Sequence, residues 1–119
     1  MSKQRFALLL NHAPDRYEGL GEDEYMAIIG DYVAWVEEMT RAGCYVDGHK
    51  LEGAPGRVVL RSGDAVEVHE GPYAELAEVL GGLMIIEADD FDAAVEIARG
   101  HPHLRHNTSM EIRALDAHA

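Results

Sequence analysis

Cysteine is nearly absent from this chain of 119 residues, in which Cys44 is the only one. A single cysteine cannot form a disulfide within the chain, and it favours a reducing compartment, so we expect a cytoplasmic protein. No CxxC pair and no base close in sequence marks Cys44 as a nucleophile. We therefore interpret it as a small core residue.

Basic residues are also scarce: 10 lysines and arginines stand against 22 aspartates and glutamates, for a formal net charge of −12. A surface of that sign repels phosphate backbones and anionic lipids, which argues against direct binding to nucleic acid or to a membrane surface. The same field favours neutral or cationic ligands over polyanions.

Long apolar runs and familiar catalytic motifs are missing from the sequence. No run approaches the roughly 18 apolar residues of a membrane span, and we expect the N-terminal residues to lead into a strand and not to form a signal peptide. P-loop, GxGxxG, GxSxG and HExxH patterns are absent, so no motif supports a nucleotide, dinucleotide, serine-hydrolase or zinc-protease function. We expect no cofactor.

What the sequence does contain is a regular alternation of strand and helix patterns, with 47% hydrophobic residues in a length that suits a single domain over residues 1–119. The apolar run Arg5–Leu10 predicts a buried central strand. A helix is predicted from Glu22 or Asp23 to Gly43, with an apolar stripe at 3/4 spacing and Trp35 on the flank of that stripe.

The second half predicts a hairpin, another buried strand, a second helix and a final strand. Asp47-Gly48 signals a turn, and Tyr45-Val46 is too short to classify. Asp89 or Asp90 is expected to cap the second helix, which Gly100 ends. The remaining expected elements are hairpin strands Arg57–Arg61 and Ala65–His69, one or two helical turns over Tyr73–Leu80, and strands Leu83–Ile86 and Ser109–Leu115.

This order is β-α-β, a hairpin, then β-α-β, which is the ferredoxin-like α+β plan with two helices on one face of a mainly antiparallel sheet. Such a sheet has one bare face that must be buried. A second copy of the chain is the usual cover, so we predict a homodimer.

Several segments resemble the YCII-related family, also called DGPF proteins. The central one is Glu70-Gly71-Pro72-Tyr73, followed by Glu75, Glu78 and Gly81-Gly82, which is similar to the signature D-G-P-F-A-E-T-K-E with its following glycines. The other similar segments are Arg5–Leu10, Ala42–Leu51, Asp89–Ala94 and Met110–Arg113. The resemblance covers nearly the whole chain and implies a dimeric α/β barrel.

Departures from the signature affect the chemistry that the resemblance implies. Ala77 stands where the signature usually has lysine, and losing that cation would make a carboxylate of Glu75 or Glu78 easier to protonate if the two share a pocket. Some relatives are thought to use a histidine on the first helix with an aspartate before the last strand. Here the first helix has no histidine, and His101 stands at the aspartate position, so that dyad does not transfer.

The candidate site residues follow from these segments. His101 is the candidate proton shuttle, because an unperturbed imidazole titrates near neutral pH. Glu70 is the candidate catalytic carboxylate, and Tyr73 beside it on the turn is a candidate substrate-binding residue. Candidate substrate-binding residues are Tyr32, Trp35 and His12, although residues of these types also serve simply to fill a core.

Three histidines, His101, His103 and His106, lie ahead of the last strand and could in principle share a metal ion. Their spacing matches no helical ligand pair, so we predict no metal site. The leading functional hypothesis is a cytoplasmic dimer that binds a small organic molecule between helices and sheet, with cofactor-free isomerase or lyase chemistry as a possible activity. The alternative is a non-catalytic regulatory module that acts through a protein partner.

Overall fold

The computed structural model describes residues 3–53, 55–71 and 76–117. Within them the elements follow one another as β1 (Gln4–His12), α1 (Glu22–Arg41), β2 (Tyr45–Lys50), β3 (Arg57–Ser62), β4 (Ala65–Glu70), β5 (Val79–Ala88), α2 (Phe91–Arg99), α3 (His103–His106) and β6 (Met110–Ala114). Tyr73 lies outside the described residues. The described part of the segment expected as helical turns, Tyr73–Leu80, is not helical: residues 76–78 form bends and Val79 begins β5.

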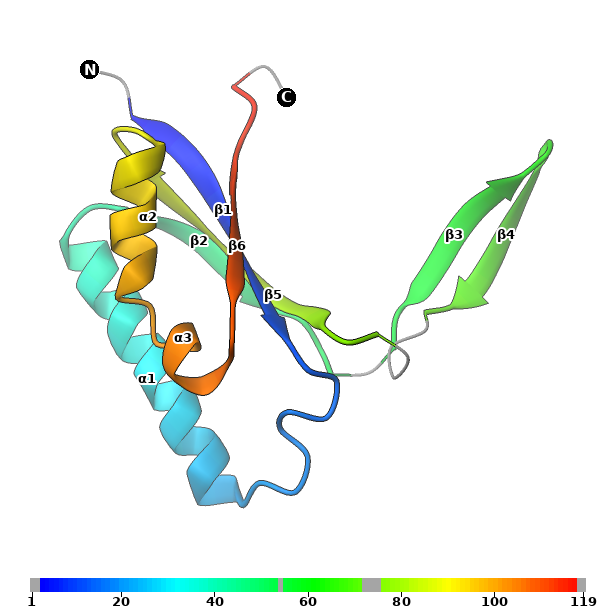
Figure 1. Ribbon diagram of the computed structural model, residues 1–119, viewed down its shortest axis with the longest axis horizontal. Coiled ribbons are helices and arrows are strands. Elements are labelled where there is room, and N and C mark those ends of the chain that lie inside the picture. Colours follow the sequence, from blue (N-terminus) through cyan, green and yellow to red (C-terminus); the bar gives the residue numbers. More distant parts are fainter. Residues whose placement is uncertain (1–2, 54, 72–75, 118–119) are drawn as a thin grey trace.

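The main sheet has four strands in the order β2-β5-β1-β6, and every neighbouring pair is antiparallel. Helices α1 and α2 lie on the same side of this sheet (Figure 1). Each β-α-β unit therefore places its two strands parallel but separated by a strand of the other unit. This is the ferredoxin-like α+β fold that the sequence predicts.

The core lies between the two helices and the sheet. Alternate residues of β1 and β5 face the helices, as the twofold period of a strand requires, and Phe6, Leu8 and Ile86 are completely buried. Trp35, on the flank of the apolar stripe, is the residue that α1 buries most deeply, at 5% exposure. The reason is a tertiary contact that the helical period does not report: its ring lies 4.2 Å, centroid to centroid, from that of His101.

The predicted helix ends are confirmed. Gly43 has a φ of +81°, the left-handed conformation that follows many helices and that glycine adopts without strain. Asp90 caps α2, its side chain accepting a hydrogen bond from the backbone N–H of Ala93 at 2.8 Å, and Gly100 follows the last residue of the helix.

Two local expectations differ from the structure. The Asp47-Gly48 pair, expected as a turn, lies within β2 and pairs with β5. Leu80 belongs to β5 and not to a helical turn, because this strand begins at Val79 and continues through Gly81-Gly82, with a register shift against β1 at Gly81. The histidine-rich segment ahead of the last strand contains the short helix α3. The ambiguous Tyr45-Val46 pair opens β2, which pairs with β5 along the edge of the sheet.

The predicted hairpin is confirmed, but β3 and β4 form a separate two-stranded sheet and do not extend the main one. Figure 1 shows this hairpin projecting away from the body, on the side of the main sheet opposite to the helices. We call β3, β4 and their turn the arm.

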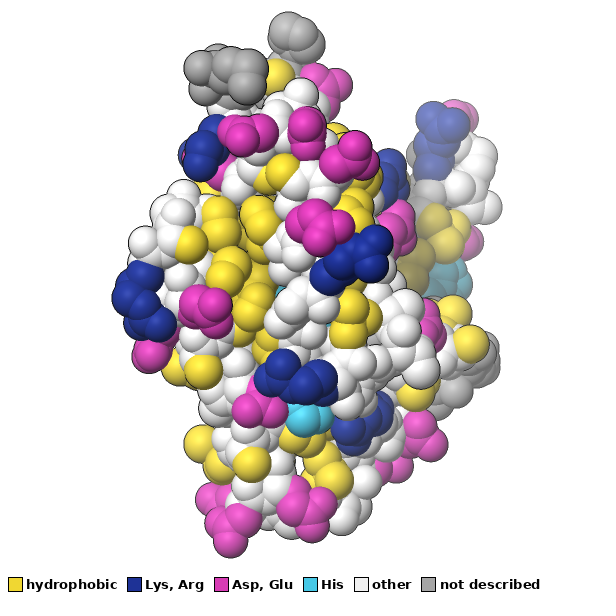
Figure 2. All heavy atoms as spheres, turned by 60° about the vertical axis from the view of Figure 1, so that its left-hand side comes forward, with side chains coloured by type: hydrophobic (Ala, Val, Ile, Leu, Met, Phe, Trp, Pro, Cys, Tyr) yellow, Lys and Arg dark blue, Asp and Glu magenta, His cyan; other side chains and the backbone are white. Residues whose placement is uncertain are grey.

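The helical side of the molecule carries much of its negative charge, with acidic side chains gathered at the upper and lower ends of that surface (Figure 2). Among the helices of the described residues, none is both long enough and apolar enough to cross a membrane.

Candidate functional site

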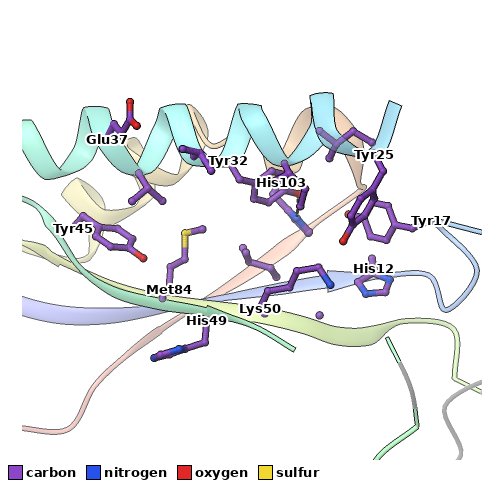
Figure 3. Close-up of a pocket in the computed structure, with 18 residues that line it drawn as sticks. His12, Tyr17, Tyr25, Tyr32, Glu37, Tyr45, His49, Lys50, Met84 and His103 are labelled. Carbon is purple, nitrogen blue, oxygen red and sulfur yellow. Dashed lines mark hydrogen bonds between the residues drawn. The ribbon is translucent and has the colours of Figure 1, made fainter. Parts of the chain in front are cut away.

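A cavity of about 380 Å³ lies between α1 and the part of the sheet formed by β1, β5 and β2. Most of its wall is apolar. Ile28, Ile29, Val33 and Val36 of α1 form the roof, while Leu10 and Met84 form part of the floor. Polar side chains gather toward one end, where the close-up in Figure 3 shows His12, Tyr17, Tyr25, Tyr32, Lys50 and His103.

His12, the last residue of β1, presents one free ring nitrogen at this end of the cavity. Its Nδ1 lies 2.6 Å from the carbonyl oxygen of Ala13, and a carbonyl can only accept, so Nδ1 carries the proton. Nε2 is then the basic nitrogen, and it has no hydrogen-bond partner in the described part of the chain. The edge of the Tyr17 ring supports the imidazole at a centroid distance of 5.1 Å.

Gly81 leaves the space that the His12 ring occupies. A Cβ atom on residue 81 would lie 2.5 Å from Nε2 of His12, which is far closer than real Cβ contacts. The backbone of Gly81 has no positive φ, so this glycine is needed for space and not for conformation. Its role is to let β5 pass directly beneath the imidazole.

Tyr32 and His103 form a hydrogen-bonded pair across the cavity end. Nε2 of His103 donates to the backbone carbonyl of Asn11 at 2.7 Å, which leaves Nδ1 to accept from the Tyr32 hydroxyl at 2.6 Å. The side-chain amide of Asn107 lies 3.4 Å from the same Nδ1 and 3.5 Å from the Tyr32 oxygen. It also donates to the Tyr17 hydroxyl at 2.9 Å, so it links both tyrosines to the histidine.

Burial fixes the charge state of this pair. It raises the pKa of the Tyr32 hydroxyl far above its usual value, with the neighbouring Tyr17 adding to the effect. Burial also lowers the pKa of His103, against the opposing effect of its bond to Asn11. Near neutral pH the pair therefore consists of a protonated phenol and a neutral imidazole.

Lys50 is the cation of the cavity, at the end of β2. Its Nζ donates to the carbonyl of Leu51 at 3.3 Å, and no ion pair within the described residues involves it. In Figure 3 its side chain runs along the floor toward His12. Glu37 lies at the opposite end of the cavity, so the two charges do not cancel.

Two of the residues predicted from the sequence, His12 and Tyr32, line this cavity together. Trp35 and Glu70 do not: Trp35 is packed in the core, and Glu70 ends β4 on the exposed arm. Tyr73 lies outside the described residues.

His101 occupies the core behind the cavity, with 1% of its surface exposed. Its Nδ1 accepts the backbone N–H of His103 at 2.9 Å, which leaves Nε2–H to donate to Met84 Sδ at 3.3 Å. Burial lowers the pKa of His101 to about 3. Such a group takes no proton near neutral pH, so the geometry does not favour His101 as the proton shuttle at the pocket mouth.

The histidine cluster is divided among different partners. His101 and His103 make the bonds described above, and Nε2 of His106 lies 2.8 Å from a carboxylate oxygen of Asp31 on α1. In the segments that the structure describes, no three histidine, cysteine or acidic side chains are arranged to hold a metal ion.

Sequence reasoning missed Tyr17 and Lys50, and it considered His103 only as a metal ligand. Tyr17 had a usable signal, because it lies in the loop that follows the central strand, and strand ends gather around ligand pockets. Lys50 had none, since its segment was too ambiguous to assign to an edge strand.

Comparison with known proteins gives the family of this chain. No curated protein matches it. The family model of the YCII-related domain matches residues 4–116, which is nearly the whole chain and includes every residue of the cavity. The resemblance that the segments around Gly71 and Gly81 indicate is thereby confirmed, and the chain belongs to the YCII-related family.

Proposed function

We propose that this protein binds a small organic molecule in the cavity beneath α1 and catalyses a cofactor-free proton transfer on it, of the isomerase or lyase type. The observation that carries the proposal is the presence of a free imidazole nitrogen, on His12, and a partly buried phenol, on Tyr32, in the wall of one apolar cavity. A volume of about 380 Å³ is within the range of small-molecule sites.

The two groups suit the two ends of a carbon-acid reaction. His12 Nε2 accepts a proton from a carbon next to a carbonyl or from a ring hydroxyl, and later returns it at another carbon or leaves it with solvent. The Tyr32 hydroxyl, kept protonated by its raised pKa, donates to the oxygen on which negative charge develops. When that hydroxyl turns to the substrate, the amide of Asn107 is close enough to take over the bond to His103.

Lys50 adds a preference for the substrate. Because its ammonium group has no carboxylate partner in the described residues and points toward His12, it stabilises an anionic oxygen next to the proton acceptor. The apolar roof favours a flat, mainly hydrocarbon ring. The expected ligand class is therefore a cyclic enone, a quinol or a related ring with one acidic oxygen.

This function can be tested without knowing the natural substrate. Cyclic ketones, enones and quinols are first screened for binding by the shifts that they cause in the NMR signals of cavity residues. The compounds that bind are then incubated with the protein in deuterium oxide, and the exchange of C–H for C–D is followed by NMR. We expect His12→Gln to abolish the protein-dependent exchange and Tyr32→Phe to slow it by about 10²-fold, the scale of one positioned oxyanion donor. His69→Gln, on the arm, is the matched control and should keep the rate.

The proposal fails if compounds that bind in the cavity exchange no faster with the protein than without it. It also fails if His12→Gln retains the full rate while ligand binding is intact.

We also propose that the protein works as a homodimer in the cytoplasm. The face of the sheet turned away from the helices carries Ala7, Leu9, Leu83 and Ile85, which alternate with the core residues of β1 and β5. An apolar sheet face of this kind needs a cover, and the lone Cys44 is compatible with a reducing compartment.

A further inference from the structure

The arm is the part of the fold that its own chain leaves uncovered. All of its residues from Arg57 to Ser62 and from Ala65 to Glu70 are exposed. An isolated two-stranded hairpin is at best marginally stable in water, because it has no layer to bury its side chains against. A hairpin that stays formed at this distance from the body needs a partner.

One face of the arm carries three valines beside charged side chains. In the register of β3 with β4, Val59 lies opposite Val68, and Arg61 lies opposite Val66, so these four side chains share a face. The exposed fraction is 65% for Val59, 69% for Val66 and 59% for Val68. These are the most exposed large apolar side chains of the described residues. A β-branched row of this kind is typical of a surface that is buried against protein.

The size of the molecule identifies what covers the arm. A compact chain of this mass has an accessible surface of about 6,400 Å², whereas this one exposes 8192 Å². Its radius of gyration is 16.5 Å, against about 13.5 Å for a compact domain of this length. The excess surface is roughly 1,800 Å² per chain, or about 3,600 Å² for two chains. This total lies in the range of about 2,000–5,000 Å² that obligate homodimers bury.

Position and charge agree with that estimate. The arm leaves the main sheet on the side opposite to the helices (Figure 1), which is the side on which a partner covering the open sheet face would lie. Arg57 and Arg61 lie on the valine face and form no ion pair within the described residues. A second copy carries 22 aspartates and glutamates, so carboxylates are available to pair with these arginines.

We propose that the arm is a dimerisation arm: its Val59, Val66 and Val68 face packs on a second copy of this chain, and the twofold-related arm packs back in the same way. This inference rests on the proposed homodimer and goes beyond it, because it assigns the stability of the dimer to the arm as well as to the open sheet face. The arm acts as a clasp outside the sheet.

The structure offers a clean excision. The backbone N–H of Gly71 donates to the carbonyl of Gly56 at 2.8 Å, so the two ends of the arm already meet. Two glycines in place of residues 57–70 can join them without stretching the main sheet. The second variant is the double substitution Val59→Asp and Val68→Asp, and the control is Met26→Asp, which places the same charge on a 57% exposed apolar residue of α1.

Sedimentation equilibrium measures the outcome. We expect wild type and Met26→Asp to sediment at twice the chain mass of 13.1 kDa. The dimer dissociation constant should rise about tenfold or more in both variants. The excised chain loses the contacts of the arm, and the double variant places charges where apolar side chains are buried. Circular dichroism shows that these variants are folded, as does binding of the same cyclic compounds in the cavity, measured by NMR shifts.

A mixed dimer gives direct evidence. With one chain labelled at its valine methyl groups and the other unlabelled, isotope-filtered NOEs from Val59, Val66 and Val68 to the unlabelled chain are expected. A wild-type monomer overturns both the homodimer and the arm. A dimer whose dissociation constant is unchanged by excision, with no intermolecular NOE from the arm, overturns the arm alone.

Discussion

Mild acid should destabilise this protein because of one buried imidazole. Burial lowers the pKa of His101 to about 3, whereas the unfolded chain binds a proton near pH 6.5. Since the depressed group is neutral in the folded state, its contribution to stability is fully present above pH 6.5 and is lost as the pH falls toward the folded pKa. The free energy of unfolding should therefore fall by about 1.4 kcal/mol per pH unit below 6.5.

Between pH 7 and pH 5 this amounts to about 2 kcal/mol from His101 alone, a large share of a typical folding free energy of 5–15 kcal/mol. Burial also lowers the pKa of His103, so its effect has the same sign and adds to the slope. The window lies above the range in which most carboxylates titrate, which keeps their contribution small.

Urea denaturation followed by circular dichroism at half-unit steps from pH 7 to pH 5 measures the effect. The test variant is His101→Gln, whose side-chain oxygen can still accept the backbone N–H of His103 but does not titrate. The variant should be less stable than wild type at pH 7. Its free energy of unfolding should also fall less steeply toward pH 5, with a slope smaller by about 1.4 kcal/mol per pH unit, which corresponds to one proton fewer. His69→Gln, at an exposed histidine, should run parallel to wild type. An equally steep fall for His101→Gln would refute the reasoning.

Two further predictions concern space and capping. Gly81→Ala should displace the ring of His12, because the new Cβ would lie 2.5 Å from Nε2, and NMR should show loss of its contact with the Tyr17 ring; an unchanged His12 ring would contradict the space argument. Gly30→Ala is its control, since no atom lies within 4 Å of a Cβ at that helical position, and it should raise stability by about 0.5–1 kcal/mol in urea denaturation. Asp90→Ala should cost about 1 kcal/mol in the same measurement through loss of the α2 cap, and an unchanged midpoint would show that the cap contributes little.

The sequence predicts the architecture of this chain well because the signals involved are local. The 3/4 apolar spacing beneath α1, the aspartate that caps α2 and the glycines that follow both helices each act within a few residues. The order of elements then leaves few topologies, of which the ferredoxin-like sheet is one.

The candidate site was less predictable, since its residues meet only through tertiary structure. Gly81-Gly82 suggested the end of a helical turn, but the pair lies within β5, where the space above Gly81 is used by a residue 69 positions earlier, His12. No local pattern reports such a contact. Similarly, the helical stripe of α1 does not show that Trp35 has an imidazole to pack against.

The contrast between His101 and His103 shows what a sequence pattern leaves open. The two residues differ by two positions and flank Pro102, yet only His103 reaches the cavity, because the turn into α3 directs the rings to different surroundings. From the sequence, the placement before Pro102 and an unperturbed titration range favoured His101, and His103 was considered only as a metal ligand. Burial decides between them.

His101 nevertheless contributes to the geometry of the site. Its Nδ1 accepts the backbone N–H of His103 at 2.9 Å, which fixes the first residue of α3 at the position from which the His103 ring reaches both Asn11 and Tyr32. The neutral state of His101 near pH 7 is also what allows Nδ1 to accept this bond, since a protonated imidazole has no free lone pair. Acid that protonates His101 should therefore disturb the bond between Tyr32 and His103 as well as the core. The residue that the sequence favours as a proton shuttle serves, in this structure, to position the histidine that meets the cavity.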